Sequence, residues 1–373
     1  MYVTLQTLLN KTHSDLDILY NLLQVFRNQF YMVKKLSVLL ILVGVVLSQN
    51  TLQAQDPQFS QYYAAPLYLN PGLVGINQKG RMGINYRTQW PNLDANFETF
   101  SGYIDYHFED YHSSAGLIFN RDSEGVVGLQ STSIGLQYAY QVQLNYQWTF
   151  RPGVQIAYYI RDLNFDKLTF GDQFDNTGQV RQFTGETFDT GQSATFFDIS
   201  FGGVLYNPSL WLGGAVHHIT EPNQSIAGGD APLPRRISFH GGYRFSLTPG
   251  SIRTDRGERS ITPSFNYRTQ GQFDQLDVGA YFTLEPILVG LWYRGLPIKN
   301  LDGITNNESI IFMLGLQNKR TTFGYSFDYT ISGLGIGTGG AHEISIAYSF
   351  SLGDPLKPAA DVRRLRCPIP FIF

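Results

Sequence analysis

The sequence predicts an all-β protein: a transmembrane, antiparallel, up-and-down β-barrel of about 14 strands, with an ordered N-terminal segment and a periplasmic C-terminal tail. Many short segments alternate apolar and polar residues with period two, as in His342 to Phe350. Charged residues make up 15% of the chain, against roughly 25% in soluble domains. Beyond residue 50, no apolar run reaches the roughly 18 residues of a spanning helix. Strands facing lipid on one side explain all three observations.

The first 54 residues are interpreted as an export signal behind a wrongly assigned gene start. Lys34 and Lys35 precede an apolar run and the small residue Ala54, which is the pattern of a secretory signal peptide over residues 32–54. Residues 1–31 then precede the true start at Met32, although a genuine helical extension is an alternative. Cleavage near Ala54 predicts an exported protein of the cell outer membrane.

The alternating segments predict a barrel over residues 79–350. Short connections, such as Asn207-Pro208 and Asn318-Lys319, are typical of turns at one rim. Longer connections at 164–193, 220–234 and 297–306 predict loops at the other rim, which the rule of short periplasmic turns and long outer loops places outside the cell. The predicted strands are 79–90, 96–109, 113–121, 127–141, 148–163, 194–206, 209–219, 235–248, 259–270, 273–284, 286–296, 307–317, 320–330 and 341–350.

Alternation also assigns the two faces of the wall. Apolar side chains such as Met82, Ile84 and Tyr86 are predicted to face lipid, and the strand charges then face the lumen. These charges form either a structural network or a lining that receives a carboxylate or a peptide terminus, because guanidinium groups bind carboxylates at two points. The predicted lumen charges are Arg81, Arg87, Asp105, Arg161, Asp198, Arg236, Arg244, Arg268, Asp277, Arg294, Asp328 and Glu343.

Two segments flank the barrel. Residues 55–78 carry prolines and many aromatic residues, which predicts an extended plug or periplasmic latch held by burial of its aromatic side chains. The tail, residues 351–373, follows the last strand and is predicted to lie in the periplasm, with a disordered end as the alternative. Its Cys367 is the only cysteine and cannot form an internal disulfide.

Motifs of catalysis, metal binding or nucleic-acid binding are missing from the sequence. The net charge of -3 gives no basic footprint, and the sequence contains no HExxH, GxSxG or GxxxxGK[ST] motif. His217 and His218 are adjacent in a predicted strand, so they should point to opposite faces and cannot share a metal. We therefore expect no enzyme, cofactor or metal. The alternative is a lipid-modifying enzyme that pairs a serine with His240 or His342.

Four segments resemble the PorP/SprF family of outer-membrane proteins of the type IX secretion system. They are QDPQFSQYYAAPLYLNPGLVG at 55–75, LTFGDQFD at 168–175, GGAHEISIAYSF before residue 351, and a basic Cys-Pro tail, which here continues to Phe373. The resemblance implies a 14-stranded accessory barrel in outer-membrane lipid. It also implies two partners: a large secreted adhesin or its C-terminal domain, and periplasmic ring or peptidoglycan-binding components.

These implications place partner-binding residues at both ends of the barrel, because loops on a rigid scaffold carry function. The outer candidates are Phe170, Gly171, Asp172, Phe174 and Asp175, for which a loop that merely caps the barrel is the alternative. The periplasmic candidates are Phe59, Tyr62, Tyr63, Asn70, Pro71, Arg363, Arg364 and Cys367. A passive or substrate-selective channel is the alternative function, since a barrel of this size can hold an aqueous path.

Overall fold

The computed structural model describes residues 55–93, 96–125, 128–163, 171–174, 193–226, 228–247, 259–301, 304–318, 320–333, 335–351 and 365–370. The predicted gene start and signal peptide lie outside these residues and stay predictions. No helix among the described residues is long and apolar enough to cross a membrane.

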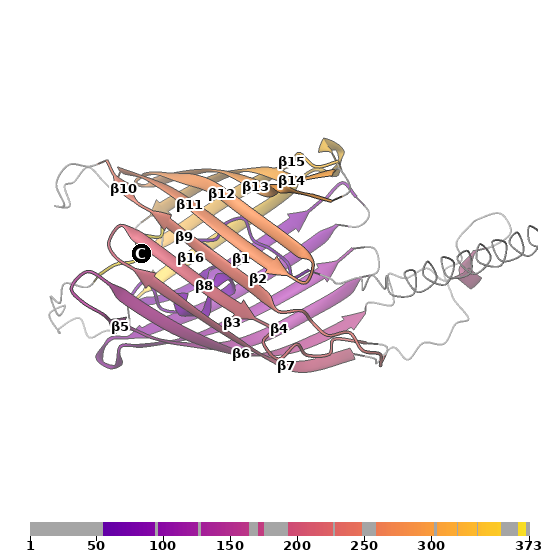
Figure 1. Cartoon of the computed structure of the whole chain (residues 1–373), viewed down its shortest axis with the longest axis horizontal. Coiled ribbons are helices and arrows are strands. Elements are labelled where there is room, and N and C mark those ends of the chain that lie inside the picture. The colour runs from indigo at the N-terminus through magenta and orange to yellow at the C-terminus, as the bar shows by residue number, and fades with distance from the viewer. Residues whose placement is uncertain are drawn as a thin grey trace, which may run out of the picture. The chain divides into compact units, whose positions relative to one another are not determined.

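The strands form a closed antiparallel barrel (Figure 1). Sixteen strands of the described residues belong to one sheet. Two of them, β5 and β10, are two-residue continuations that pair only with β6 and β11, which leaves fourteen wall strands. Pairing of β1 with β16 and of β9 with β11 closes the ring. The predicted 14-stranded barrel is therefore confirmed.

The first half of the wall contains β1 (Gly80–Gln89), β2 (Phe97–Phe108), β3 (Ser113–Glu124), β4 (Leu129–Tyr140), β5 (Val142–Gln143), β6 (Thr149–Leu163), β7 (Ser193–Tyr206) and β8 (Leu210–His217). The second half contains β9 (Arg236–Tyr243), β10 (Phe245–Ser246), β11 (Arg259–Gln270), β12 (Phe273–Leu284), β13 (Ile287–Leu301), β14 (Ile304–Asn318), β15 (Thr321–Thr330) and β16 (Ala341–Phe350). Short helical turns are α2 (Pro66–Leu69), η1 (Pro71–Leu73), η2 (Glu109–Tyr111), η4 (Gly171–Gln173) and η5 (Ile336–Thr338).

One predicted loop is wrong. Strand β13 extends to Leu301 and β14 begins at Ile304, and these two residues pair with each other, so the β13–β14 hairpin extends into the predicted loop. Pro297 favoured a loop in the sequence, because proline cannot donate a ladder hydrogen bond. It falls in a register shift between Leu296 and Asn300, where the missing donor is tolerated.

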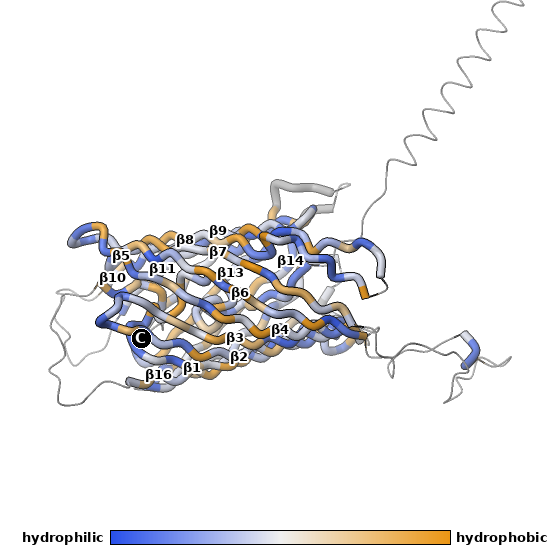
Figure 2. The backbone as a smooth tube through the Cα atoms, turned by 90° about the horizontal axis from the view of Figure 1, so that it is seen from below, coloured by the Kyte–Doolittle hydropathy of each residue, from blue (hydrophilic) through white to orange (hydrophobic). Residues whose placement is uncertain are grey.

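The wall separates apolar and polar side chains as alternation predicts. Exposed and buried positions alternate along β1 and β4, and Figure 2 shows hydrophobic and hydrophilic residues mixed along each strand. Met82, Ile84 and Leu136 are exposed on the outside, at 45%, 47% and 67% of their surface. A soluble protein would bury such residues, so this surface suits lipid.

The N-terminal segment, residues 55–78, occupies the lumen, where Figure 1 shows indigo ribbon inside the barrel. It begins near the long-loop end, since Asp56 contacts His218 and Gln270. It ends at the opposite, short-turn end, where Gly75 contacts Asp105 just before β1 begins. The segment therefore crosses the barrel from the end assigned to the outside to the end assigned to the periplasm.

Candidate functional site

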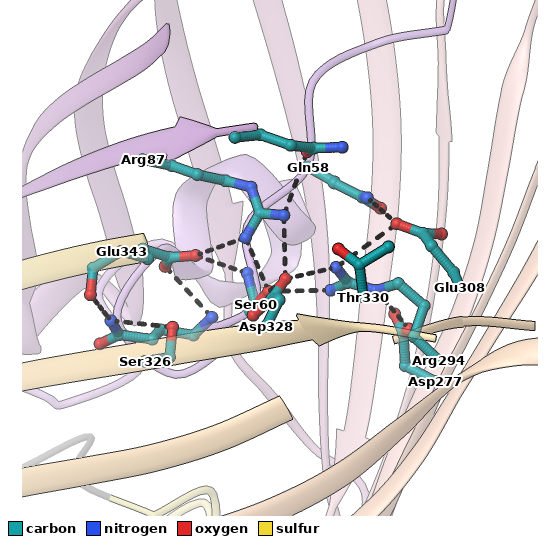
Figure 3. A network of polar contacts seen from close by, with 12 residues as sticks. Gln58, Ser60, Arg87, Asp277, Arg294, Glu308, Ser326, Asp328, Thr330 and Glu343 are labelled. Atoms are coloured by element: carbon teal, nitrogen blue, oxygen red, sulfur yellow. Dashed lines mark hydrogen bonds and ion pairs between the residues drawn. The ribbon is translucent and has the colours of Figure 1, made fainter. Parts of the chain in front are cut away.

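A buried polar network joins the N-terminal segment to several wall strands (Figure 3). The Ser60 hydroxyl donates to Asp328 Oδ2 at 2.7 Å and accepts from Arg87 and Arg294 at 2.9 and 3.0 Å. The backbone N–H groups of Ser60 and Gln61 donate to the two carboxylate oxygens of Glu343 at 2.6 and 3.1 Å. One short stretch of the segment thus satisfies charges from β1, β13, β15 and β16.

The charges of this network are paired and dehydrated. Arg294 lies 2.8 Å from both Asp277 and Asp328, and Arg87 lies 2.9 Å from Asp328. Fewer than 5% of the surface of each of these four side chains is exposed. The Tyr62 hydroxyl also bonds Asp277. A buried charge is tolerated only with such partners, so this part of the lumen is a structural lock.

A second polar cluster holds the start of the segment near the long-loop end. The Asp56 carboxylate lies 2.9 Å from Arg236 Nη1 and 2.7 Å from His218 Nε2. His218 Nδ1 lies 3.1 Å from Asp198. Burial by itself lowers the pKa of His218, but the two carboxylates outweigh it and raise that pKa to about 9. His218 is therefore charged at neutral pH.

The prediction that His217 and His218 face opposite sides is wrong. Strand β8 ends at His217, and His218 adopts a left-handed backbone with φ of 57°. Alternation stops at that point, so both rings contact the N-terminal segment, His217 at Leu69 O and His218 at Asp56. No group of three or more potential metal ligands occurs among the residues that the structure describes.

The Asn-Pro turn of the segment fits against glycines in the wall. Asn70 Nδ2 donates to the carbonyl oxygens of Gly203 and Gly214 at 3.1 and 3.0 Å, and Asn70 Oδ1 accepts from Gly72. A side chain at Gly202 would overlap Asn70 Oδ1. Asn70 and Pro71 are buried in this seat.

Arginines also hold the short-turn end of the segment. Arg81 lies 2.7 Å from Asp105 Oδ2, which accepts the N–H of Gly75 at 2.7 Å. Arg151 is fully buried and donates to the carbonyl oxygens of Gly72 and Val74. Sequence reasoning missed Arg151, although its inward position in the alternation of β6 was an available signal.

Part of the C-terminal tail returns to the lumen. Cys367 and Ile369 are buried against Tyr206 and Trp211, near the short-turn end, and Leu365 O accepts from Gln78. Burial raises the pKa of the Cys367 thiol to about 12. The described part of the tail, residues 365–370, thus packs in the barrel instead of extending freely into the periplasm, because its apolar side chains find partners there.

Other predicted residues take different places. Phe59, Tyr62 and Tyr63 line the lumen, whereas Gly171, Asp172 and Phe174 form a turn after β6 in which Phe174 is half exposed. Arg161 and Arg268 bond glutamine oxygens, and Arg244 donates to Pro208 O at the β7–β8 turn, where it interrupts the predicted strand 235–248. Phe170, Asp175, Arg363 and Arg364 lie outside the described residues.

The two histidines of the enzyme alternative have other partners. His240 Nε2 lies 3.1 Å from the Asn70 amide, and His342 Nδ1 lies 2.9 Å from the Tyr325 hydroxyl. Neither contact is the serine–histidine pair that the hydrolase hypothesis requires.

Comparison with known families then identifies the chain. A family model described as "Type IX secretion system membrane protein PorP/SprF" matches residues 51–348. The chain belongs to the PorP/SprF family. This membership agrees with the resemblance in the sequence. The PorP/SprF family is described as a secretion-system membrane protein and is not a known enzyme family. A search of curated proteins finds no match.

Solved structures similar to this PorP/SprF chain are other barrels. The outer membrane protein Omp33 of Acinetobacter baumannii is 8% identical, with a TM-score of 0.39 over 73% of this chain and 98% of its own. The P. putida toluene transporter TodX is 10% identical, with a TM-score of 0.45 over 76% of this chain and 93% of its own. The KdgM porin is 9% identical, with a TM-score of 0.30 over 72% of this chain and 99% of its own.

Proposed function

We propose that this PorP/SprF chain is a non-enzymatic accessory protein of the type IX secretion system. In this proposal it binds a large secreted surface protein, such as an adhesin or its C-terminal domain, and anchors it or helps its export. Its periplasmic side links to ring or peptidoglycan-binding components. A signal peptide cleaved near Ala54 delivers it to the outer membrane.

The observation that carries the proposal is the filled lumen. Residues 55–78 cross the barrel and bond buried charges on several strands, and the tail residues 365–370 pack beside them. A barrel filled in this way is a rigid platform, whose free surfaces are its loops and rims. Binding at those surfaces is the function that this arrangement favours.

The proposed binding surface on the outside includes the turn Gly171–Phe174, with the neighbouring positions Phe170 and Asp175. Phe174 exposes 52% of its surface, and a large exposed aromatic side chain is a typical anchor of a protein interface. The periplasmic surface includes Arg363 and Arg364, which precede the buried tail. Phe59, Tyr63, Asn70, Pro71 and Cys367 are buried and Tyr62 is partly buried, so they would support binding by holding the segment and the tail in place.

The test is purification of the tagged chain from its own outer membrane in mild detergent, with mass spectrometry of the chains that accompany it. We expect near-stoichiometric recovery of a large secreted protein or of periplasmic type IX components. The Phe174→Ala variant should lose the secreted partner. Leu93→Ala, which also removes an exposed apolar side chain at the long-loop end, should retain it. Recovery of the barrel alone would contradict the proposal.

A channel remains the second candidate, because a row of cavities lies between the segment and strands β9 to β12. Planar-bilayer conductance separates the two functions. If the barrel is a binding platform, the intact chain should show no steady conductance. Steady open-channel currents from the intact chain would favour the channel.

A further inference from the structure

The lumen contains a row of cavities along the inward side of β11. The cavity nearest the long-loop end is lined by Gln55, Asp56, Arg236 and Arg268 among others. The next shares Arg236 and Arg268 with it. The third shares Tyr62, Leu69 and Asn266 with the second. The row therefore leads from the long-loop end into the middle of the barrel.

The second cavity, which we call the β11 pocket, contains polar atoms without partners. It is lined by Phe59, Tyr62, Ala65, Tyr68, Leu69, Arg236, Ser238, Asn266 and Arg268. Ser238 and Asn266 are each 5% exposed, and Ser238 Oγ and Asn266 Oδ1 form no hydrogen bond among the described residues. Leaving such an atom unpaired costs about 1–3 kcal/mol. A ligand that supplies the missing bonds would recover part of this cost.

The β11 pocket also has an excess of positive charge. Its lining contains two arginines and no acidic residue. Arg236 is paired with Asp56, at 2.9 Å. The guanidinium of Arg268 bonds only the amide oxygens of Gln275 and Gln58, and its Nη1 has no partner within the described part of the chain. Arg268 thus keeps a charge and two N–H donors for an anion.

We propose that the β11 pocket binds a carboxylate that carries an adjacent N–H or O–H donor and a short apolar group. Arg268 receives the carboxylate, because a guanidinium binds a carboxylate better than any neutral group does. Asn266 Oδ1 accepts the neighbouring donor, and the hydroxyl of Ser238 completes the polar contacts. The rings of Phe59, Tyr62 and Tyr68 surround the apolar group. This chemistry is shared by a small acylated amino acid and by the C-terminal residue of a peptide.

The test is calorimetric titration of the full chain in detergent with N-acetyl-L-leucine and with N-acetyl-L-leucinamide. The two probes share the donor and the apolar group, and only the first is an anion. We expect the acid to bind at least tenfold more tightly than the amide, since one charge-assisted hydrogen bond is worth roughly that factor. Equal affinity for the two probes, or no binding of the acid at about 10 mM, would overturn the proposal.

Two substitutions locate the ligand. Arg268→Gln should weaken binding of the acid by roughly tenfold or more, and Asn266→Leu should weaken it severalfold. The control is Arg121→Gln, an exposed arginine that likewise bonds a glutamine oxygen, at 2.7 Å, outside the cavities. It should bind like the natural chain. Unchanged binding by a folded Arg268→Gln barrel, verified by its heat-modifiable gel mobility, would also overturn the proposal.

The source of the carboxylate is then distinguished with a ten-residue peptide that ends in leucine. Binding that requires its free C-terminus identifies a chain end as the ligand. Binding of N-acetyl-L-leucine without binding of the peptide identifies a small acid. Both results support the proposed chemistry.

Discussion

The two sides of the lumen hold the N-terminal segment in different ways. Toward β1, β13, β15 and β16, Ser60 and Gln61 bond buried charges at ordinary hydrogen-bond distances. Toward β9 and β11, the same segment faces cavities in which Ser238 and Asn266 have unpartnered polar atoms. The first wall, the locked wall, fixes the segment, and the second, the cavity wall, leaves space beside it.

This difference separates stability from binding. Buried charges that lose a partner are expensive, so changes on the locked wall should release the segment. On the cavity wall, Ser238 Oγ and Asn266 Oδ1 have no partner to lose, although Arg236 and Arg268 still bond the segment at Asp56 and Gln58. Space for a ligand therefore exists on the side where two buried polar atoms of the wall have no partner in the segment.

The largest effect on the free energy of unfolding is expected for a substitution at the centre of the locked wall. Arg294→Met leaves Asp277 and Asp328 without their shared guanidinium and should lower the free energy of unfolding by about 3–5 kcal/mol. Urea unfolding in detergent, followed by heat-modifiable gel mobility, measures it. Arg235→Met is the control, because its partner Glu221 is 45% exposed and a surface pair contributes about 0–1 kcal/mol. Equal effects of the two substitutions would contradict the comparison.

A matched pair of serine substitutions compares the walls directly. Ser60→Ala removes one bond to Asp328 and two from arginines, and should cost about 1.5–3 kcal/mol. Ser238→Ala removes a buried hydroxyl without a partner, so it should not destabilise the barrel and should raise the unfolding free energy by up to about 1–3 kcal/mol. Protease digestion of the folded barrels should then cut residues 55–78 faster only in Ser60→Ala. Similar digestion of both variants would remove the distinction.

The glycine seat of Asn70 provides a third test. Gly202→Ala places a methyl group against the Asn70 side chain, and such overpacking should cost about 1–3 kcal/mol. Gly214→Ala is the control, since its added methyl would meet Phe239 at an ordinary 3.4 Å. The measurement is the urea midpoint of each variant. A shift in Gly214→Ala as large as in Gly202→Ala would show that the seat has no special role.

The smallest effect concerns the start of the segment and depends on pH. Because carboxylates raise the pKa of His218 to about 9, from roughly 6.5 for a free histidine, its stabilising contribution is complete below pH 6.5 and is lost as the pH rises through 9. The pKa of Asp56 is lowered, although burial opposes this, because His218 and Arg236 stabilise its charge. Its contribution is lost only in acid.

A spin label at Gln55→Cys, in a Cys367→Ala background, measures this effect. Its mobility should increase between pH 7 and pH 10 while the barrel stays folded. The His218→Gln control should show high mobility at both pH values. If the mobility of the label is the same at pH 7 and pH 10 in the chain that retains His218, then His218 is not the anchor.

Much of the barrel was predictable because alternation has a direct physical cause. In β1, Met82, Ile84 and Tyr86 face outward and Arg81 and Arg87 face inward, as the period of two requires. The prediction was wrong where backbone geometry departs from that period. His218 turns inward after β8 has ended, and the β13–β14 hairpin continues past Pro297 through a register shift.

The barrel, the strand count and the sorting of charge to the inside follow from the amino-acid pattern alone, because each depends on local alternation. The partner that each charge meets depends on the tertiary structure. Ser60 and Asp328, and Asp56 and His218, are far apart in the chain, and the path of the N-terminal segment through the lumen brings them together. Such pairings depend on chain closure in three dimensions, about which a period of two along one strand carries no information.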